Sequence, residues 1–508
     1  MLFRSFAVPT LMKIVQKSFL PPVEEGEFVV NIRTPEGTTL AATDLMTERF
    51  ARAIRELHGV EGTLLTIGDS DQRTPNLAGI FVRLTDPAQR ADQQTLMDAV
   101  RKEIVPHFPA EWRISVLSVP PFNTGMSSAN VQYFIAGPDL DALTRATASV
   151  MKEVKDLPGI RDLDSSLIPG KPEITGTVDR NKAGEMGASM ADISSTLRLL
   201  VGGLDVSSFD DGGEQYDIHL QAVESYRNSR EILNLLTVPS TKAGPVAVSN
   251  LLTLENTDSP SQINRLNRRR QVTITANNAP GVGETVILEG IAAAVKKLGL
   301  PADYASGSAG RSKEMAKAAN AFMVAFLMAF IFMYLILAAQ FESWVHPFTI
   351  LLALPLTLPF AILSLIIFDQ SLNIFSMLGI LVLFGMVKKN GILQIDHTNQ
   401  LRAKGMNRLD AILLANKERL RPILMTTMAF VAGMIPMMLA KGVGAAYNNA
   451  TAGVILGGQS LSLLLTLLAT PVIYSLFDDV IHFRQRRREK RDARAGEKAA
   501  AQAEAASA

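Results

Sequence analysis

The sequence of 508 residues contains no cysteine, which excludes disulfide bonds, cysteine-ligated zinc sites and thiol catalysis. Its six histidines are scattered, and no nucleophile stands beside a base in a recognisable arrangement. The run Gly281-Val282-Gly283-Glu284 lacks the lysine and hydroxyl of a phosphate-binding loop. A net charge of +1 gives no global field that would attract nucleic acid. We therefore expect no enzymatic activity, no cofactor, no resident metal and no nucleic-acid partner.

Charge is also absent from five long stretches between Lys317 and Asp478. Each stretch holds roughly 20 apolar residues, which is the length of helix that crosses a bilayer. The sequence therefore predicts a helical membrane domain behind a large soluble block. The predicted spans are Ala318–Ala339, Pro347–Phe368, Ile374–Ile395, Pro422–Ala440 and Ala452–Phe477.

Lysine and arginine are distributed unequally around the predicted spans. They are frequent in the loop Asp396–Arg421 and at the start of the tail Arg484–Ala508, whereas the short loops on the opposite side contain only Lys441. Because excess Lys and Arg marks the cytoplasmic side, the loop and the tail are predicted inside and the soluble block outside. The composition of the tail predicts disorder.

Residues 1–20 do not resemble a signal peptide, because the apolar run Phe6–Met12 is short, contains Pro9 and precedes no small-residue cleavage site. We expect them to be the last turns of a membrane span whose start is missing. Leu2-Phe3-Arg4-Ser5 is also what a common sequencing adapter encodes, which indicates an artificial start.

The soluble block alternates between strand and helix patterns and then repeats that order from Val131. Strand–helix–strand units used twice predict two ferredoxin-like split βαβ modules, the second interrupted by an insert near Leu204–Gln262. Two similar modules with a cleft between them suit ligand capture better than catalysis. The predicted fold class is therefore α+β modules joined to an α-helical transmembrane bundle.

Several short motifs follow one another along nearly the whole chain, and their order and spacing are more specific than any one of them. They are Phe19-Leu20-Pro21-Pro22-Val23-Glu24-Glu25-Gly26, Asp179-Arg180-Asn181-Lys182-Ala183, Gln340-Phe341-Glu342-Ser343-Trp344, Lys389-Asn390 and Arg419-Leu420-Arg421-Pro422-Ile423-Leu424-Met425-Thr426. With these motifs the chain resembles the C-terminal half of a resistance–nodulation–division (RND) efflux pump of the hydrophobe/amphiphile (AcrB-like) branch.

The resemblance implies a division of the chain into successive parts. A span remnant at 1–20 precedes a first porter subdomain at 21–125. A second porter subdomain at 126–203 and 263–315 is interrupted by a docking-type insert at 204–262. A five-helix transmembrane domain at 316–480 and a disordered cytoplasmic tail at 481–508 complete the chain.

Lys389 lies inside the third predicted span, where an ammonium is costly unless a carboxylate or water pairs with it. Ionisable residues inside spans are usually functional, although Lys389 or Lys388 could also snorkel to the nearby surface. The resemblance favours Lys389 and implies a proton relay of Lys389, Arg419 and Thr426. The alternatives are that Arg419 is a positive-inside anchor and that Thr426 bonds to its own helix carbonyls.

In the family, this relay also includes two aspartates from a span of the N-terminal half. The present sequence has no carboxylate inside a span that could replace them, since Asp396 is predicted at a helix end. We therefore expect this chain alone to be unable to complete the relay.

The loop Gly68–Gly79 is polar, whereas the corresponding loop of well-known drug exporters is phenylalanine-rich. Asp69 and Arg73 of this loop, and Phe81 of the strand that follows, are the predicted substrate-binding residues. For Phe81 the alternative is a place in the module's core, where strand phenylalanines are more often found.

The function implied by the resemblance is proton-driven export of amphiphilic small molecules from the inner membrane of a Gram-negative bacterium. It further implies a homotrimer that meets a periplasmic adaptor protein and an outer-membrane channel. One alternative is a heavy-metal exporter of the same superfamily, which the absence of Cys and of clustered Met or His in the soluble block disfavours. Another is a non-transporting membrane scaffold or sensor, which the charge of Lys389 disfavours.

Overall fold

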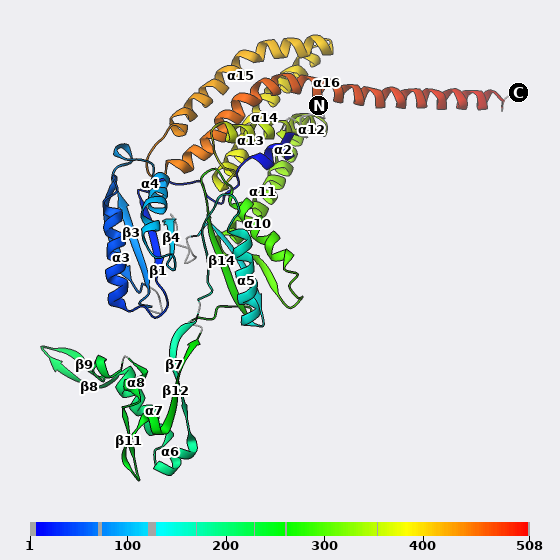
Figure 1. Cartoon of the computed structure of the whole chain (residues 1–508). Coiled ribbons are helices and arrows are strands. Elements are labelled where there is room, and N and C mark those ends of the chain that lie inside the picture. Colours follow the sequence, from blue (N-terminus) through cyan, green and yellow to red (C-terminus); the bar gives the residue numbers. More distant parts are fainter. Residues whose placement is uncertain are drawn as a thin grey trace. The chain divides into compact units, whose positions relative to one another are not determined.

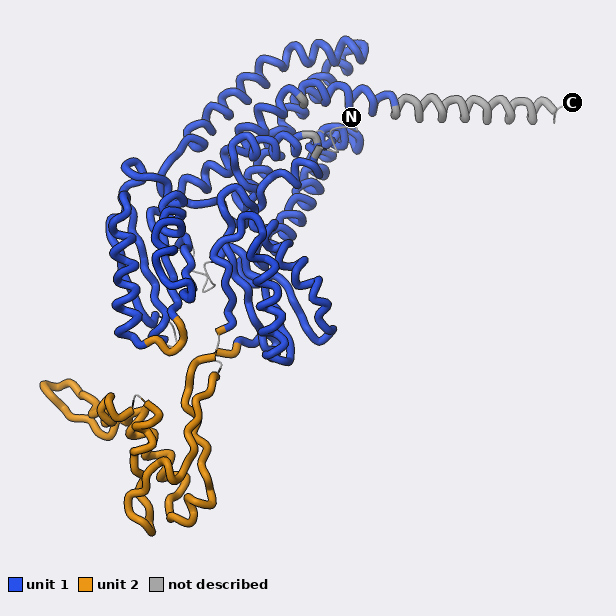
Figure 2. Tube along the Cα trace, viewed as in Figure 1, with its two compact units in different colours: residues 1–34, 39–167, 264–508 blue, residues 35–38, 168–263 orange. Residues whose placement is uncertain are grey.

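The computed structural model describes residues 7–69, 74–119, 129–168, 170–227, 229–259, 262–352 and 354–505. Contacts divide the chain into two compact units (Figure 2). The first unit consists of residues 1–34, 39–167 and 264–508, and the second of residues 35–38 and 168–263.

The first module of unit 1 is a four-stranded antiparallel sheet in the order β2-β3-β1-β4 with helices α3 and α4 (Figure 1). Its sequence order of strand–helix–strand twice over, with β1 between β3 and β4, is the ferredoxin-like arrangement. Phe28, Val30 and Ile32 alternate into the core, as a half-buried strand requires. The elements are β1 (Glu27–Arg33), α3 (Leu40–Arg55), β2 (Val60–Ile67), β3 (Leu77–Leu84), α4 (Gln93–Ala99) and β4 (Arg113–Ser118).

The second module repeats this arrangement, with β14 and β15 following the chain's return from unit 2. Its sheet has the order β13-β14-β5-β15, and β6 also pairs with β14. The core lies between the sheet and helices α5 and α10, around Ile135, Leu143 and Ile291. The elements are β5 (Val131–Gly137), α5 (Leu140–Val154), β6 (Ile160–Ser165), β13 (Arg265–Leu266), β14 (Arg269–Asn278), α10 (Glu284–Lys297) and β15 (Ala305–Ser308).

Unit 2 has its own small core around Ile193, Val248 and Leu251. Its main segment begins at Ile168, and the strand that enters it pairs with the strand that leaves it. Its main elements are β7 (Lys171–Val178), α6 (Arg180–Met186), α7 (Met190–Leu197), β8 (Leu204–Asp211), β9 (Glu214–Leu220), α8 (Arg230–Leu233), β10 (Thr237–Ser240), β11 (Gly244–Ala247), α9 (Val248–Leu251) and β12 (Leu252–Ser259).

The predicted membrane domain is a helical bundle. Among the described residues, α11, α14 and α15 are long and apolar enough to cross a membrane, and the apolar part of α16 qualifies as a pair bent by 53°. The second predicted span is divided into α12 and α13, in a stretch that contains Pro355 and Pro359. The elements are α2 (Ala7–Ile14), α11 (Gly310–Phe341), α12 (His346–Leu351), α13 (Leu354–Ile367), α14 (Ile374–Ala403), α15 (Arg408–Met438) and α16 (Ala445–Ala505).

The fold class predicted from the sequence, split βαβ modules joined to a helical bundle, is thus confirmed. Helix α16 extends through the polar tail to Ala505. Its Ala, Glu, Lys and Arg residues all have high helix propensity, which explains how a polar segment can take this form.

Candidate functional site

A cleft of about 810 Å³ lies between the two modules of unit 1. The alternation of the strands creates its walls. In β1 and β14 the even-numbered residues 28–32 and 272–276 fill the two cores, and the odd-numbered residues 29–33 and 273–277 line the cleft. Each sheet therefore packs one face on its own core, and the opposite faces of the two sheets line the cleft.

The walls of the cleft are mixed in chemistry. The predicted substrate-binding residue Phe81 is half-buried and lines the cleft, so it does not belong to the first module's core. Asp69 also lines it and is exposed, whereas Arg73 lies outside the described residues. Other lining residues include the apolar Val29, Leu64, Leu77 and Leu117 and the polar Asn31, Arg113, Gln132, Asp162 and Asp164.

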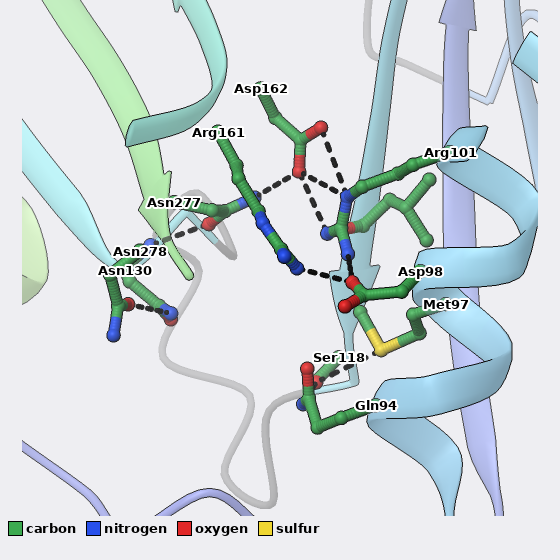
Figure 3. A network of polar contacts seen from close by, with 11 residues as sticks. Gln94, Met97, Asp98, Arg101, Ser118, Asn130, Arg161, Asp162, Asn277 and Asn278 are labelled. Atoms are coloured by element: carbon green, nitrogen blue, oxygen red, sulfur yellow. Dashed lines mark hydrogen bonds and ion pairs between the residues drawn. The ribbon is translucent and has the colours of Figure 1, made fainter. Parts of the chain in front are cut away.

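Charged side chains bridge the modules beside the cleft (Figure 3). Arg101, which follows α4, donates from Nη2 to Asp162 Oδ2 at 2.8 Å and from Nη1 to Asp98 Oδ1 at 3.0 Å. Arg161 of β6 reaches back across the boundary to the same Asp98 carboxylate. Two arginines and two aspartates thus alternate along the network, and each module contributes one arginine and one aspartate. Charge-assisted hydrogen bonds of this kind offset the cost of removing the charges from water.

Each module also positions its own members of this network. Val116 of β4 accepts a hydrogen bond of 2.6 Å from Arg101 Nη2, and Asn277 of β14 donates from Nδ2 to Asp162 at 2.8 Å. Asp162 has a positive φ of 47°, a left-handed conformation that Asp tolerates better than most residues. The carboxylate is therefore held from both sides.

A second crossing contact lies nearby. Arg113 of β4 donates from Nη1 to Asp164 Oδ1 at 3.1 Å and to the carbonyls of Ser165 and Leu167 at 3.2 and 3.0 Å. Arg113 and Asp164 also line the cleft. The modules are therefore joined across one edge of the cleft by charged hydrogen bonds.

The predicted relay residues lie on two helices of the bundle. Lys389 of α14 is exposed, and Arg419 of α15 is half-buried. Thr426 of α15 is exposed and donates to the carbonyl of Ile423 at 3.2 Å, which is the self-bonding alternative for this threonine. Within the described part of the chain no hydrogen bond or ion pair joins these three side chains, and Arg419 Nε is buried without a partner.

The crossing ion pairs are the part of the site that sequence reasoning missed. The partners Arg101 and Asp162 are far apart in the chain and look like ordinary surface charges. Only the positions of α4 and β6 in the folded modules bring them together.

Comparison with known proteins places the chain in a family. The model of the AcrB/AcrD/AcrF family matches residues 4–478. The chain is 28% identical over 468 residues to "Multidrug resistance protein MdtC" of Cronobacter sakazakii, covering 91% of this chain and 45% of that protein. The identity and coverage are the same for the protein of that name from Klebsiella pneumoniae. The chain therefore spans about half the length of these curated relatives.

Solved structures show the same fold. Two crystal forms of a heavy metal efflux pump superpose with TM-scores of 0.84 and 0.81, at 24% and 23% sequence identity. The matches cover 94% and 93% of this chain, and 50% and 48% of those chains. The family model's match over residues 4–478 shows that the chain belongs to the AcrB/AcrD/AcrF family of RND efflux transporters.

Proposed function

We propose that this chain is the C-terminal half of a proton-driven transporter that exports amphiphilic small molecules, and that it is inactive alone. The observation that carries the proposal is the cleft between the modules. Its walls combine an aromatic and several aliphatic side chains with Asp69, Arg113 and Gln132. A molecule with an apolar body and a polar group would find partners for both parts there.

The proposed proton coupling uses Lys389, Arg419 and Thr426. The exposure of Lys389 and Thr426 leaves these side chains uncovered by the present chain. Carboxylates of an N-terminal half could reach them there and would pair with the ammonium of Lys389. Protonation of such a carboxylate would break the pair and favour a different packing of the helices.

The remaining parts of the proposal concern assembly and location. The complete protein would be a homotrimer in the inner membrane of a Gram-negative bacterium, with both modules and unit 2 in the periplasm. Unit 2 would dock toward an outer-membrane channel, and a periplasmic adaptor protein would complete the assembly. The proposal is supported by the family membership and by the Lys/Arg-rich loop between α14 and α15.

The test of coupling uses the full-length transporter reconstituted in liposomes, with trimer content checked first. We expect Lys389→Ala to bind substrate but to show no transport driven by a pH gradient, because the carboxylate loses its counter-charge. Lys388→Ala is the matched control and should retain most transport. Normal transport by Lys389→Ala would refute the coupling role of this residue.

Substrate capture is tested separately by ligand binding without a gradient. We expect Phe81→Ala to weaken binding of neutral and charged amphiphiles alike, by about 1–3 kcal/mol, because it removes aromatic contact area. Asp69→Asn should weaken binding of cationic amphiphiles only. Unchanged binding by both variants would move the substrate site away from this cleft, and binding of a divalent metal ion by the parent in place of amphiphiles would favour the heavy-metal alternative.

A further inference from the structure

Helices α14 and α16 pack side by side and run in the same direction. A Cβ at Gly458 would lie 2.5 Å from Leu383, and one at Gly391 would lie 3.8 Å from the Thr470 hydroxyl. Further toward the C-terminal ends of both helices, the Tyr474 hydroxyl of α16 donates to Asn399 Oδ1 of α14 at 2.8 Å. The residue numbers of both helices increase together through these contacts, so the helices are parallel and share one continuous interface. This interface is called the α14–α16 seam below.

The seam changes character along its length. On α14 the buried residues include Ile380, Leu383 and Val387 and, further along the helix at the same helical spacing, Asn390, Gln394 and Thr398. On α16 the buried stripe contains Gln459, Ser462, Thr466 and Thr470. The side chains of both groups are at least nine-tenths buried, so this half of the seam is polar and closed to the outside.

Hydrogen bonding accounts for only part of these polar groups. The hydroxyls of Thr398, Ser462 and Thr466 donate to carbonyls of their own helices. Several buried atoms of these two helices have no partner among the described residues of the protein: Asn390 Nδ2, Gln394 Nε2 and Oε1, Gln459 Oε1 and Thr470 Oγ1. Buried polar groups in native proteins are almost always satisfied, by protein or by ordered water.

The helix geometry adds a further acceptor to the same region. Pro471 has no N–H, so it cannot pair with the carbonyl of Leu467 one turn earlier. The bend of 53° between Ala445–Leu464 and Thr466–Asp479 also falls within the seam. Sharp bends occur at prolines or where a water enters the ladder of helix hydrogen bonds.

We infer that the α14–α16 seam is a binding site for ordered water molecules inside the membrane bundle. Water suits the site because the unpartnered atoms include donors, acceptors and a hydroxyl that can act as either. A bound water makes two to four hydrogen bonds, so a few molecules satisfy this set.

The water site ends at a charged cluster. Arg402 donates to the Tyr474 hydroxyl at 2.9 Å and to Asp478 at 2.8 Å, and Asp478 also pairs with Arg408. The bound waters would therefore form a hydrogen-bonded route from the level of Asn390 to this cluster. That the route carries protons away from Lys389 rests on the proposed coupling, whereas the presence of water does not.

The test is the reactivity of single cysteines, which can be introduced into a chain that has none. The full-length protein would carry Gln394→Cys or Thr470→Cys, with Leu383→Cys and Val454→Cys as controls on the dry half of the same seam. The probe is methyl methanethiosulfonate, which is small and neutral and reacts with the thiolate that forms where water reaches the sulfur.

We expect Gln394→Cys and Thr470→Cys to react at least about tenfold faster than the two controls, since the thiolate, not the thiol, is the nucleophile. Equal, slow reaction at all four positions would overturn the proposal and indicate that the amides pair with one another. Equal, fast reaction would also overturn it, because the seam would then be open along its whole length.

A second measurement covers variants that fail to fold. Radiolytic hydroxyl radicals generated from bound water should oxidise Tyr474, with Trp112 of the first module's core as an internal reference. In the double variant Gln394→Leu/Thr470→Val, oxidation of Tyr474 relative to Trp112 should fall. Unchanged oxidation would refute bound water in the seam. Neither readout uses transport, so failure of the coupling proposal would leave this inference standing.

Discussion

Between the two modules, Arg101 and Asp162 have side chains that are only 15% and 9% exposed, yet each has several hydrogen-bond partners. In the bundle, Gln394 is 2% exposed, and neither polar atom of its side chain has a partner among the residues that the structure describes. Both places remove polar groups from water, but protein atoms replace the lost water around Arg101 and Asp162 and not around the Gln394 amide. The difference separates contacts that hold a fixed geometry from the place where we infer bound water.

The crossing ion pairs specify geometry because each of the four charges contacts an opposite charge on the other module. A buried charge that loses its partner keeps the desolvation penalty without the compensating attraction. An unpaired amide in the bundle carries no net charge, and a water molecule can replace its missing partner at low cost. Removing a side chain should therefore have a large effect in the first region and a small one in the second.

The largest expected effect comes from Asp162→Ala. Removing one partner of a buried pair usually costs about 3–5 kcal/mol, and we expect the lower end, about 3 kcal/mol, because Arg101 keeps Asp98. The measurement is thermal unfolding of the full-length protein. The control Glu61→Ala removes the exposed partner of Arg83 and should cause no measurable change.

A double-mutant cycle makes this prediction specific to the pair. The double variant Arg101→Ala/Asp162→Ala should lose less stability than the sum of the two single variants, because the second change removes a charge that is already unpaired. Strict additivity would show that the contact across the modules contributes nothing and that Asp162 acts only within its own module.

The sequence predicts the cores of the modules well because burial imposes a period on the residues. The alternation in β1 and the helical spacing in α3 are both present in the structure. Strand β2 is harder to recognise from the sequence, because it has no clean alternation: Leu64 is exposed, and the pairing shifts at Val60–Gly62. The exposed strand β7 gives no sign in the sequence that β12 pairs with it.

The candidate site is less predictable than the fold. Phe81 could be assigned to the cleft by resemblance, and the alternation of β3 agrees, since Ile80 and Val82 on either side of it are buried. The pair Arg101–Asp162 depends on the packing of two modules against each other, which no local pattern records. The roles of Lys389, Arg419 and Thr426 stay predictions, because their proposed partners are not part of this chain.

Glu284 of α10 is an intermediate case, a buried carboxyl with partners at the junction between the second module and the bundle. It accepts from Phe19 N at 3.1 Å and pairs with Arg311 at the start of α11 at 3.2 Å. Burial raises the pKa of Glu284 above its usual range, although Arg311 and the Phe19 amide oppose this shift. A raised pKa in the folded state means that the folded protein binds this proton more tightly than the unfolded chain.

The stability contributed by the proton on Glu284 is present below the pKa of the unfolded carboxyl and is lost as pH rises through the folded pKa. We therefore expect the melting temperature of the parent to fall relative to that of Glu284→Gln as the pH rises above 4.5, the ordinary pKa of a glutamate. The exposed Glu289→Gln on the same helix is the control and should follow the parent. If the parent instead gained stability over this range relative to Glu284→Gln, the pKa of Glu284 would be lowered in the folded state. The ion pair with Arg311 would then outweigh burial.

The smallest expected effect is that of Gln394→Leu in the seam. The substitution keeps a side chain of similar size and removes two polar atoms that have no protein partner, so the bound water leaves with them. Exchanging a solvated amide for an apolar group of similar shape is nearly neutral, and we expect a change in stability within about 1 kcal/mol. The same thermal unfolding measurement applies, beside Leu383→Ala, which opens a cavity in the dry half and should cost about 2–5 kcal/mol. A loss for Gln394→Leu as large as that for Asp162→Ala would mean that the amide is held by protein as firmly as the crossing charges are, and the contrast between the two regions would no longer hold.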